Sequence, residues 1–449
     1  SQYGDIALIG QGGSNGLMGS NGNRGIKMKF KPRIISRDIP EGGNPGEAAK
    51  ITIDGTGGAG DDGNTGVFIR SLGTRVTSQY GDIDITGQGG SNGRMGSNGN
   101  RGIRIRNSKV ISRDIPGTGN PAEAASITLD GTGGAGDSLN DGVFMRFGFD
   151  RVKLSSQYGD IQVTGRGGSN GLAGSNANRG VYLQAKIISR DIPEGGNPGE
   201  AATITVDGKG GAGDSDNRGL FIAKGSRITS QYGAIDLTGR GGSNGQVGSN
   251  SNAGTRIRKG VDIESRDIPD GGDPARAATI TIDGTGGAGD SGNLGLAIRK
   301  NSDISSYYGD ISLTGRGNSY GSDGFNTGVF LRRGPDIVSK GTGENAADIT
   351  IKGIADQSSS GRGIRGKFVR DTDIVADSGD IAITGKGHDS TGIRTMRAIT
   401  VESAQGDLTL ATDSLVSAEE IPTMAAGGVL RIKPVTAGRA ISIGNSTGG

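Results

Sequence analysis

The chain has 449 residues, 90 of them glycine, and its 49 Lys and Arg nearly balance its 47 Asp and Glu. That balance gives no electrostatic footprint for nucleic acid or an anionic membrane, no apolar run could span a bilayer, and the lack of Cys excludes disulfides and thiolate metal sites. Only 31% of residues are apolar, against about 45–50% in globular domains, which suits a narrow solenoid better than a thick two-layer domain.

A tetrapeptide marks a long internal repeat. Ser-Gln-Tyr-Gly begins at Ser1, Ser78, Ser156 and Ser230, and Ser-Tyr-Tyr-Gly begins at Ser306, so successive starts lie 74 to 78 residues apart. A period this regular is typical of repeat proteins, which build extended surfaces and fibres more often than single catalytic pockets. Because the chain begins inside a repeat, we expect it to be a segment of a longer protein.

Each period holds two units of three short strands. In the first unit of the second period, the strands are predicted at residues 81–87, at residues 102–106 and around Val110 and Ile111. In the second unit they are predicted at residues 127–130, 142–146 and 151–154. Alternation places every second side chain inside. The expected buried residues are Ile83, Ile85, Ile103, Ile105, Ile127 and Leu129.

Three strands and one glycine-rich loop per unit, with no helical period, predict an all-β fold. We expect a right-handed parallel β-helix with about 38 residues per three-strand coil and a double-coil repeat of about 77 residues. About 12 coils would stack at about 4.8 Å, and glycine would supply positive φ at the corners. A β-propeller or sandwich would instead show hairpins with two-residue turns. Residues 1–335 form the regular repeats, and residues 336–449 form irregular C-terminal coils of the same solenoid.

Several strand sequences resemble a known family. Gly-Asp-Ile-Asp-Ile-Thr-Gly at 81–87, Gly-Asp-Ile-Ala-Ile-Thr-Gly at 379–385 and Gly-Val-Leu-Arg-Ile-Lys-Pro at 428–434 are similar to the coils of filamentous-haemagglutinin-like adhesins, as is Ala-Ile-Ser-Ile-Gly at 440–444. These are large bacterial surface proteins secreted by the two-partner route. The resemblance implies an extracellular β-helical rod used for adhesion, matrix or filament building.

One loop type suggests calcium. Gly-Gly-Ala-Gly-Asp-Asp at 57–62 fits the calcium-binding nonapeptide Gly-Gly-x-Gly-x-Asp. The other three copies carry Ser138, Ser215 and Ser291 where the final Asp should lie. A hard cation needs six or more oxygen ligands, so a structural loop is the favoured interpretation, and no cofactor is expected although calcium remains an alternative.

A repeated Ser-Arg-Asp-Ile-Pro segment places an arginine beside an aspartate in four corners. A row of acids along a groove would suit a polysaccharide lyase or hydrolase, whereas charge ladders on stacked corners are the structural alternative, with Pro ending the strand. We favour the structural alternative, because a catalytic site is usually singular. The pairs are Arg37 and Asp38, Arg113 and Asp114, Arg190 and Asp191, and Arg266 and Asp267.

Catalysis has little support elsewhere in the sequence. His388 is the only histidine, and no nucleophile motif accompanies it. Trp is absent and aromatic residues make up 4% of the chain, which disfavours a sugar cleft lined by stacking rings. We therefore predict that the protein is not an enzyme.

Four phenylalanines recur at outward positions of the second strands: Phe68, Phe144, Phe221 and Phe330. Either long loops of the chain cover them, or they form an exposed apolar stripe of the kind that marks an interaction surface. They are the candidate assembly contacts.

The sequence thus favours an extracellular structural protein that forms or decorates a bacterial surface filament, sheath or adhesin. We expect self-association, a possible cell-surface or matrix polysaccharide partner, no nucleic-acid partner and no membrane span. The alternatives are a β-helical polysaccharide-degrading enzyme and a calcium-dependent surface module.

Overall fold

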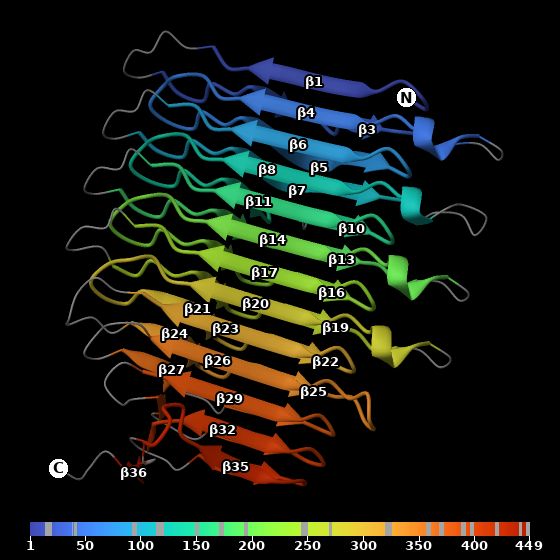
Figure 1. Cartoon of the computed structure of the whole chain (residues 1–449). Coiled ribbons are helices and arrows are strands. Elements are labelled where there is room, and N and C mark those ends of the chain that lie inside the picture. Colours follow the sequence, from blue (N-terminus) through green and yellow to red (C-terminus); the bar gives the residue numbers. More distant parts are fainter. Residues whose placement is uncertain are drawn as a thin grey trace.

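The computed structural model describes residues 1–13, 20–37, 39, 43–91, 97–113, 121–148, 152–169, 175–192, 196–243, 250–268, 272–318, 326–355, 361–367, 372–387, 392–395, 399–417, 422–439 and 442–445. They form one stack of coils running from β1 to β35 (Figure 1). Each strand pairs in parallel with the equivalent strand of the next coil. The predicted parallel β-helix is confirmed.

The first strands of the coils form a sheet of 13 strands, and we number coils 1 to 13 by these strands. They are β1 (Ile6–Gln11), β4 (Ile51–Thr56), β6 (Ile83–Gln88), β8 (Ile127–Thr132), β11 (Ile161–Arg166), β14 (Ile204–Lys209), β17 (Ile235–Arg240), β20 (Ile280–Thr285), β23 (Ile311–Gly317), β26 (Ile349–Ala355), β29 (Ile381–Lys386), β32 (Leu408–Thr412) and β35 (Leu430–Lys433).

The second and third strands share the other sheet. In coils 2 and 3 they fuse into β5 (Val67–Ser78) and β7 (Ile103–Ser112). The second strands are β2 (Ile26–Met28), β9 (Val143–Arg146), β12 (Val181–Leu183), β15 (Leu220–Ile222), β18 (Thr255–Arg258), β21 (Leu294–Arg299), β24 (Thr327–Arg332), β27 (Arg362–Lys367), β30 (Ile393–Thr395), β33 (Ser414–Ser417) and β36 (Ser442–Asn445). The third strands are β3 (Arg33–Ile35), β10 (Val152–Ser156), β13 (Ala185–Ser189), β16 (Arg227–Ser230), β19 (Asp262–Ser265), β22 (Asp303–Ser306), β25 (Asp336–Ser339), β28 (Thr372–Ala376), β31 (Ile399–Ser403) and β34 (Thr423–Ala426).

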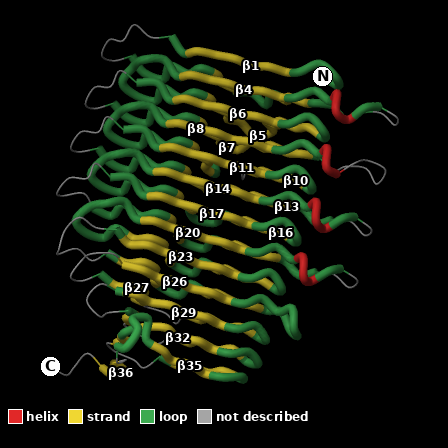
Figure 2. Tube along the Cα trace, in the orientation of Figure 1, coloured by secondary structure: helices red, strands yellow, loops and turns green. Residues whose placement is uncertain are grey.

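Short 3-10 helices lie along one edge of the rod (Figure 2). They follow the third strands of coils 1, 3, 5 and 7 and were not predicted. Asn44 and Asn197 cap the first and third helices by accepting a hydrogen bond from a backbone N–H. The helices are η1 (Pro45–Glu47), η2 (Pro121–Glu123), η3 (Pro198–Glu200) and η4 (Pro274–Arg276).

The coils alternate in length. Ile6 pairs with Ile51 and Ile51 pairs with Ile83, so the first coil advances 45 residues and the second 32. Toward the C-terminus the advance falls to 22 residues, between Leu408 and Leu430. The unit of about 38 residues inferred from the sequence is therefore an average of long and short coils in the regular part of the chain.

Stacked aliphatic side chains fill the interior of the rod. All six residues predicted to be buried, from Ile83 to Leu129, are 0–1% exposed. In coils 1 to 11 two glycines meet within the coil and keep the interior narrow; a Cβ on Gly165 would lie 2.2 Å from the carbonyl oxygen of Gly180. Glycine thus serves mainly for close backbone approach here, and supplies positive φ at only some corners, such as Gly225.

A ladder of buried asparagines links the coils where each second strand begins. From Asn64 onward, Oδ1 of each Asn accepts a hydrogen bond from the backbone N–H of the Asn one coil earlier, at 2.8–3.0 Å. Asn23, at the first coil, is half-buried and only donates in the ladder. These bonds satisfy backbone donors at a turn where strand pairing stops. The ladder consists of Asn23, Asn64, Asn100, Asn140, Asn178, Asn217, Asn252, Asn293 and Asn326.

Candidate anion-binding face

The outward side of the second strands carries a row of arginine and aromatic residues. Phe68 pairs in register with Arg104, Arg104 with Phe144, and Phe144 with Tyr182. The row continues through Phe221 to Arg256. We call this surface the arginine face, and include in it the arginines that flank the row: Arg24, Arg70, Arg101, Arg106, Arg146, Arg179, Arg218, Arg258, Arg299, Arg332, Arg362 and Arg365.

The four candidate phenylalanines lie in this face, and each points outward from the sheet. They are nevertheless only 3–9% exposed, because arginine side chains cover their rings. Arg24 lies 4.9 Å from the centre of the Phe68 ring, and Arg299 lies 4.7 Å from that of Phe330. These four phenylalanines therefore form no exposed apolar stripe, because arginines of the described residues lie over their rings. Contacts between chains at these phenylalanines stay a prediction.

In coils 3 to 5 two of the arginines, Arg101 and Arg179, have an acidic partner. The buried carboxylate of Asp141 lies 3.0 Å from Nε of Arg101 and 3.7 Å from a guanidinium nitrogen of Arg179. Arg101 and Arg179 also lie over the rings of Phe144 and Tyr182, at 4.4 and 5.0 Å. Charge pairing and cation–π contacts stabilise this part of the face internally.

In coils 6 to 10 the arginine face carries many more cations than acids. This part of the arginine face holds a depression of about 500 Å³, whose one acidic residue among the described ones is Asp216. Asp216 contacts Arg218 and lies 3.9 Å from Arg256. The basic residues lining the depression are Arg218, Arg256, Arg258, Arg299, Arg332 and Arg365.

Burial destabilises the charged form of these arginines. Burial first, and then the charge of Arg256, lowers the pKa of Arg218 to about 9. Burial lowers the pKa of Arg256 and of Arg299 to about 10, with Arg299 and Arg332 as the main charged neighbours. The guanidinium groups stay protonated at neutral pH, and the buried Nε atoms of Arg218, Arg256, Arg299 and Arg332 have no hydrogen-bond acceptor. An anion bound in the depression would balance this positive charge.

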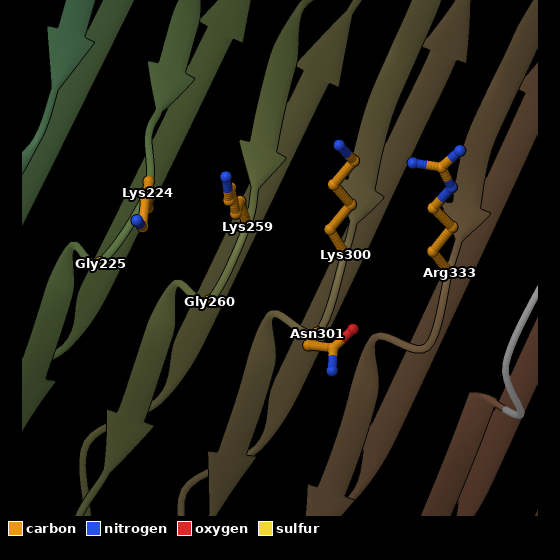
Figure 3. A pocket seen from close by; sticks show the side chains of 7 residues that line it. All are labelled: Lys224, Gly225, Lys259, Gly260, Lys300, Asn301 and Arg333. Atoms are coloured by element: carbon orange, nitrogen blue, oxygen red, sulfur yellow. The ribbon is translucent and has the colours of Figure 1, made fainter.

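A second trough lies beside the depression, at the corner between second and third strands (Figure 3). Its volume is about 530 Å³, and Lys224, Lys259, Lys300 and Arg333 line it on successive coils. Lys259 and Lys300 both have positive φ, at 72° and 60°. The backbone N–H of Lys259 donates to the carbonyl of Arg299, and that of Lys300 to Arg332, at 3.0 and 2.9 Å. We call these four residues the cationic corner.

The loops that suggested calcium contain hydrogen-bonding positions between coils. Oδ1 of Asp62 accepts a hydrogen bond from the backbone N–H of Asn98 at 2.7 Å. At the same position in later copies, the hydroxyl of Ser138 donates to Asn98 at 2.6 Å, and that of Ser215 donates to Asn176 at 2.7 Å. Serine and aspartate at this position thus both form a hydrogen bond to a neighbouring coil. Among the described residues, no group of three or more His, Cys, Asp and Glu could hold a metal ion.

The arginines of the Ser-Arg-Asp-Ile-Pro corners connect coils. A guanidinium nitrogen of Arg190 donates to the carbonyl of Ser112 at 2.5 Å, and one of Arg266 donates to Ser189 at 2.7 Å. Arg113 makes the equivalent contact with Ser36. These bonds reach two coils back, as expected for a structural ladder. Asp38, Asp114 and His388 lie outside the described residues.

Comparison with models of protein families finds no match to this chain, and comparisons with curated proteins and with solved structures find none either. None of the helices in the described parts is long and apolar enough to cross a membrane. The fold and its surfaces therefore carry the functional argument.

The near-neutral net charge of the chain does not reveal the arginine face. Summed over the chain, acids cancel bases, so composition gives no hint that cations gather on one surface. The signal lay in the residues after each Asn-x-Gly triplet. Arg256, Arg258 and Lys259 follow the triplet of coil 7, for example, and Arg299 and Lys300 follow that of coil 8.

Proposed function

We propose that this chain is a structural rod of a bacterial cell surface, part of a filament, sheath or adhesin, and that it binds acidic polysaccharide along its arginine face. The observation that carries the proposal is the depression of coils 6 to 10, which six arginines line and in which Asp216 is the one acidic residue among the described ones. One or more cations per coil, repeating at about 4.8 Å, suit a linear polymer with regularly spaced carboxylates or sulfates. Self-association of rods into a filament or bundle belongs to the same proposal.

The buried rings favour polysaccharide over single-stranded nucleic acid. Single strands are usually held by base stacking on exposed aromatic side chains. Phe221 and Phe330 are only 9% and 6% exposed beneath their arginines, so they offer no stacking platform. Guanidinium groups instead present paired donors that match a carboxylate or a sulfate.

Binding of polyuronate and sulfated polysaccharide to the full chain tests this proposal. The triple substitution Arg256→Ser, Arg299→Ser and Arg332→Ser should weaken binding about tenfold or more, and should reduce its dependence on salt. The matched control replaces Arg166, Lys209 and Arg240 by Ser; these exposed residues are stacked in register on the first-strand sheet. Equal binding by both triple variants would contradict the proposal, as would tighter binding of single-stranded DNA.

The enzyme alternative is tested in the same samples. Polysaccharide chain length is measured after long incubation with the protein. We expect no change, because the arginine–aspartate corners are repeated and the arginines described there bind backbone carbonyls. Depolymerisation that disappears on replacing one Asp would establish the enzyme instead.

A further inference from the structure

The outward side of the third strands is sorted by charge. In coils 1 to 6 its first outward residue is basic, and in coils 7 to 10 it is acidic. We call this column the charge ladder. Its basic residues are Arg33, Arg75, Lys109, Lys153, Lys186 and Arg227, and its acidic residues are Asp262, Asp303, Asp336 and Asp373.

Within one chain this order places like charges next to each other. Neighbours in the ladder are strand partners, about 4.8 Å apart, so they repel. Burial, then Asp336 and Asp262, raise the pKa of Asp303. Burial raises the pKa of Asp336, opposed by a backbone hydrogen bond from Asp373, while the charge of Asp373 adds a smaller rise. The two halves meet at Arg227 and Asp262. A surface with the opposite order of charges would relieve the repulsion along both halves.

We propose that two copies of this chain pair face to face and antiparallel through their charge ladders, about a two-fold axis between coils 6 and 7. The inference names the surface for the self-association proposed above and rests on that proposal. The axis places Arg227 against the partner's Asp262 and Lys186 against the partner's Asp303. Because both ladders have the same strand spacing, Lys153 then faces the partner's Asp336, and Lys109 faces the partner's Asp373. A single patch serves both copies, as a two-fold interface requires.

The shape of the coils fits this arrangement. Coils that face each other have numbers that add to 13, so an odd coil always meets an even one. The helices η1 to η4 follow odd coils only, and each therefore lies opposite a corner without such a helix. In a parallel pair, coils of the same number would lie opposite each other. Each 3-10 helix would then lie opposite the same helix of the partner, and each ladder residue would face a residue of like charge.

The second outward residues of the third strands form a column beside the ladder. The column mixes aliphatic residues with Ser, Thr and Glu: Ile111, Ser155, Ile188, Thr229, Glu264, Ser305, Val338 and Val375. A two-fold axis in the plane of the interface sets each column against the same column of the partner. Ile111 would then meet the partner's Val375, whereas Ile188 and Val338 would meet the partner's Ser305 and the partner's Ser155, so the contact beside the ladder is of mixed polarity.

Charge reversal tests the pairing in solution by sedimentation of the full chain. The acid-rich variant carries Lys153→Glu, Lys186→Glu and Arg227→Glu; the base-rich variant carries Asp262→Lys, Asp303→Lys and Asp336→Lys. Each alone should be monomeric where the unaltered chain is dimeric, and an equimolar mixture should restore the dimer. Reversal of Arg166, Lys209 and Arg240 to Glu, with circular dichroism to check folding, is the control. A dimer of either ladder variant alone, or a monomeric mixture, would overturn the inference.

Engineered cysteines test the orientation, because the chain has no cysteine of its own. Lys186→Cys combined with Asp303→Cys should give disulfide-linked dimers on mild oxidation. The two sites lie three coils apart in one chain, about 14 Å, too far for an internal disulfide. Lys186→Cys alone would cross-link only a parallel pair. A monomeric unaltered chain that still binds polysaccharide would end the pairing inference while leaving the arginine face intact.

Discussion

Nε of Arg227 lies 3.1 Å from a carboxylate oxygen of Asp262, and the charge ladder changes sign between these two residues. Arg227 also contacts Glu264 at 2.9 Å. Both side chains of the first pair are more than 40% exposed, so the pair contributes little to the stability of one rod. Its place at the centre of the ladder gives it another use, because it marks the axis about which a second copy can pair.

Acidification should dissociate the proposed dimer. Burial raises the pKa values of Asp262, Asp303 and Asp336 in the single chain. Arg227 lowers the pKa of Asp262, and Lys340 lowers the pKa of Asp262 and Asp303, while Glu264 adds to the rise at Asp262. Pairing with lysines and arginines favours the charged carboxylates, so the dimer binds fewer protons and loses affinity as pH falls through these raised values. Sedimentation between pH 7 and pH 4 measures the change; a dimer unaffected by acid would contradict it.

The asparagine ladder should be a main source of stability. Asn178 is fully buried; its Nδ2 donates to Asp137 and Ser175 at 3.0 and 2.9 Å, and its Oδ1 accepts from Asn140. Asn178→Ala leaves buried partners unsatisfied and should lower the free energy of unfolding by about 2–4 kcal/mol. Gln162→Ala, on the exposed side of the same coil, should change it by less than about 0.5 kcal/mol. Denaturant unfolding of both variants compares them.

Replacing glycine by alanine should reduce stability most where two backbone segments of one coil lie in contact. A Cβ at Gly165 would lie 2.2 Å from the carbonyl oxygen of Gly180, so Gly165→Ala must move one wall of the coil. We expect a loss of about 4 kcal/mol or more, seen as a lower thermal midpoint or loss of soluble protein. Gly13→Ala is the control, because no atom of the described residues lies within 4 Å of the added methyl. Equal stability of the two variants would show that the coil is less tightly packed than the structure indicates.

The fold could be predicted because strand alternation and the repeat act locally and recur in every coil. Ile83 and Ile85 alternate with polar residues, so the sequence shows their inward direction without any tertiary knowledge. The arginine face and the charge ladder could not be predicted in this way. Lys186 and Arg227 are 41 residues apart in a chain of alternating coil lengths, and only the register of β13 with β16 makes them neighbours.

The same limit explains the phenylalanines. Their outward direction follows from alternation, but their cover comes from arginines of the neighbouring coils and of the flanking column, whose positions require the register. Arg104, for example, lies 5.1 Å from the ring of Phe68 in the preceding coil.

The aromatic rings should also support the proposed binding surface. Phe221 lies beneath Arg218 and Arg256, with their guanidinium carbons 4.9 and 5.9 Å from its centre. Phe221→Ala removes that support and should lower the free energy of unfolding by about 3–5 kcal/mol. It should also weaken polysaccharide binding several-fold, because both arginines line the depression of coils 6 to 10.

Phe68→Ala is the matched control for this effect. Its ring is equally buried under arginines, but it lies in coil 2, away from the depression. We expect a similar loss of stability and unchanged binding, measured under conditions where both variants are fully folded. Equal binding by the two variants would show that Phe221 has only a packing role, whereas a loss of affinity confined to Phe221→Ala would place the bound polymer over coils 6 to 10.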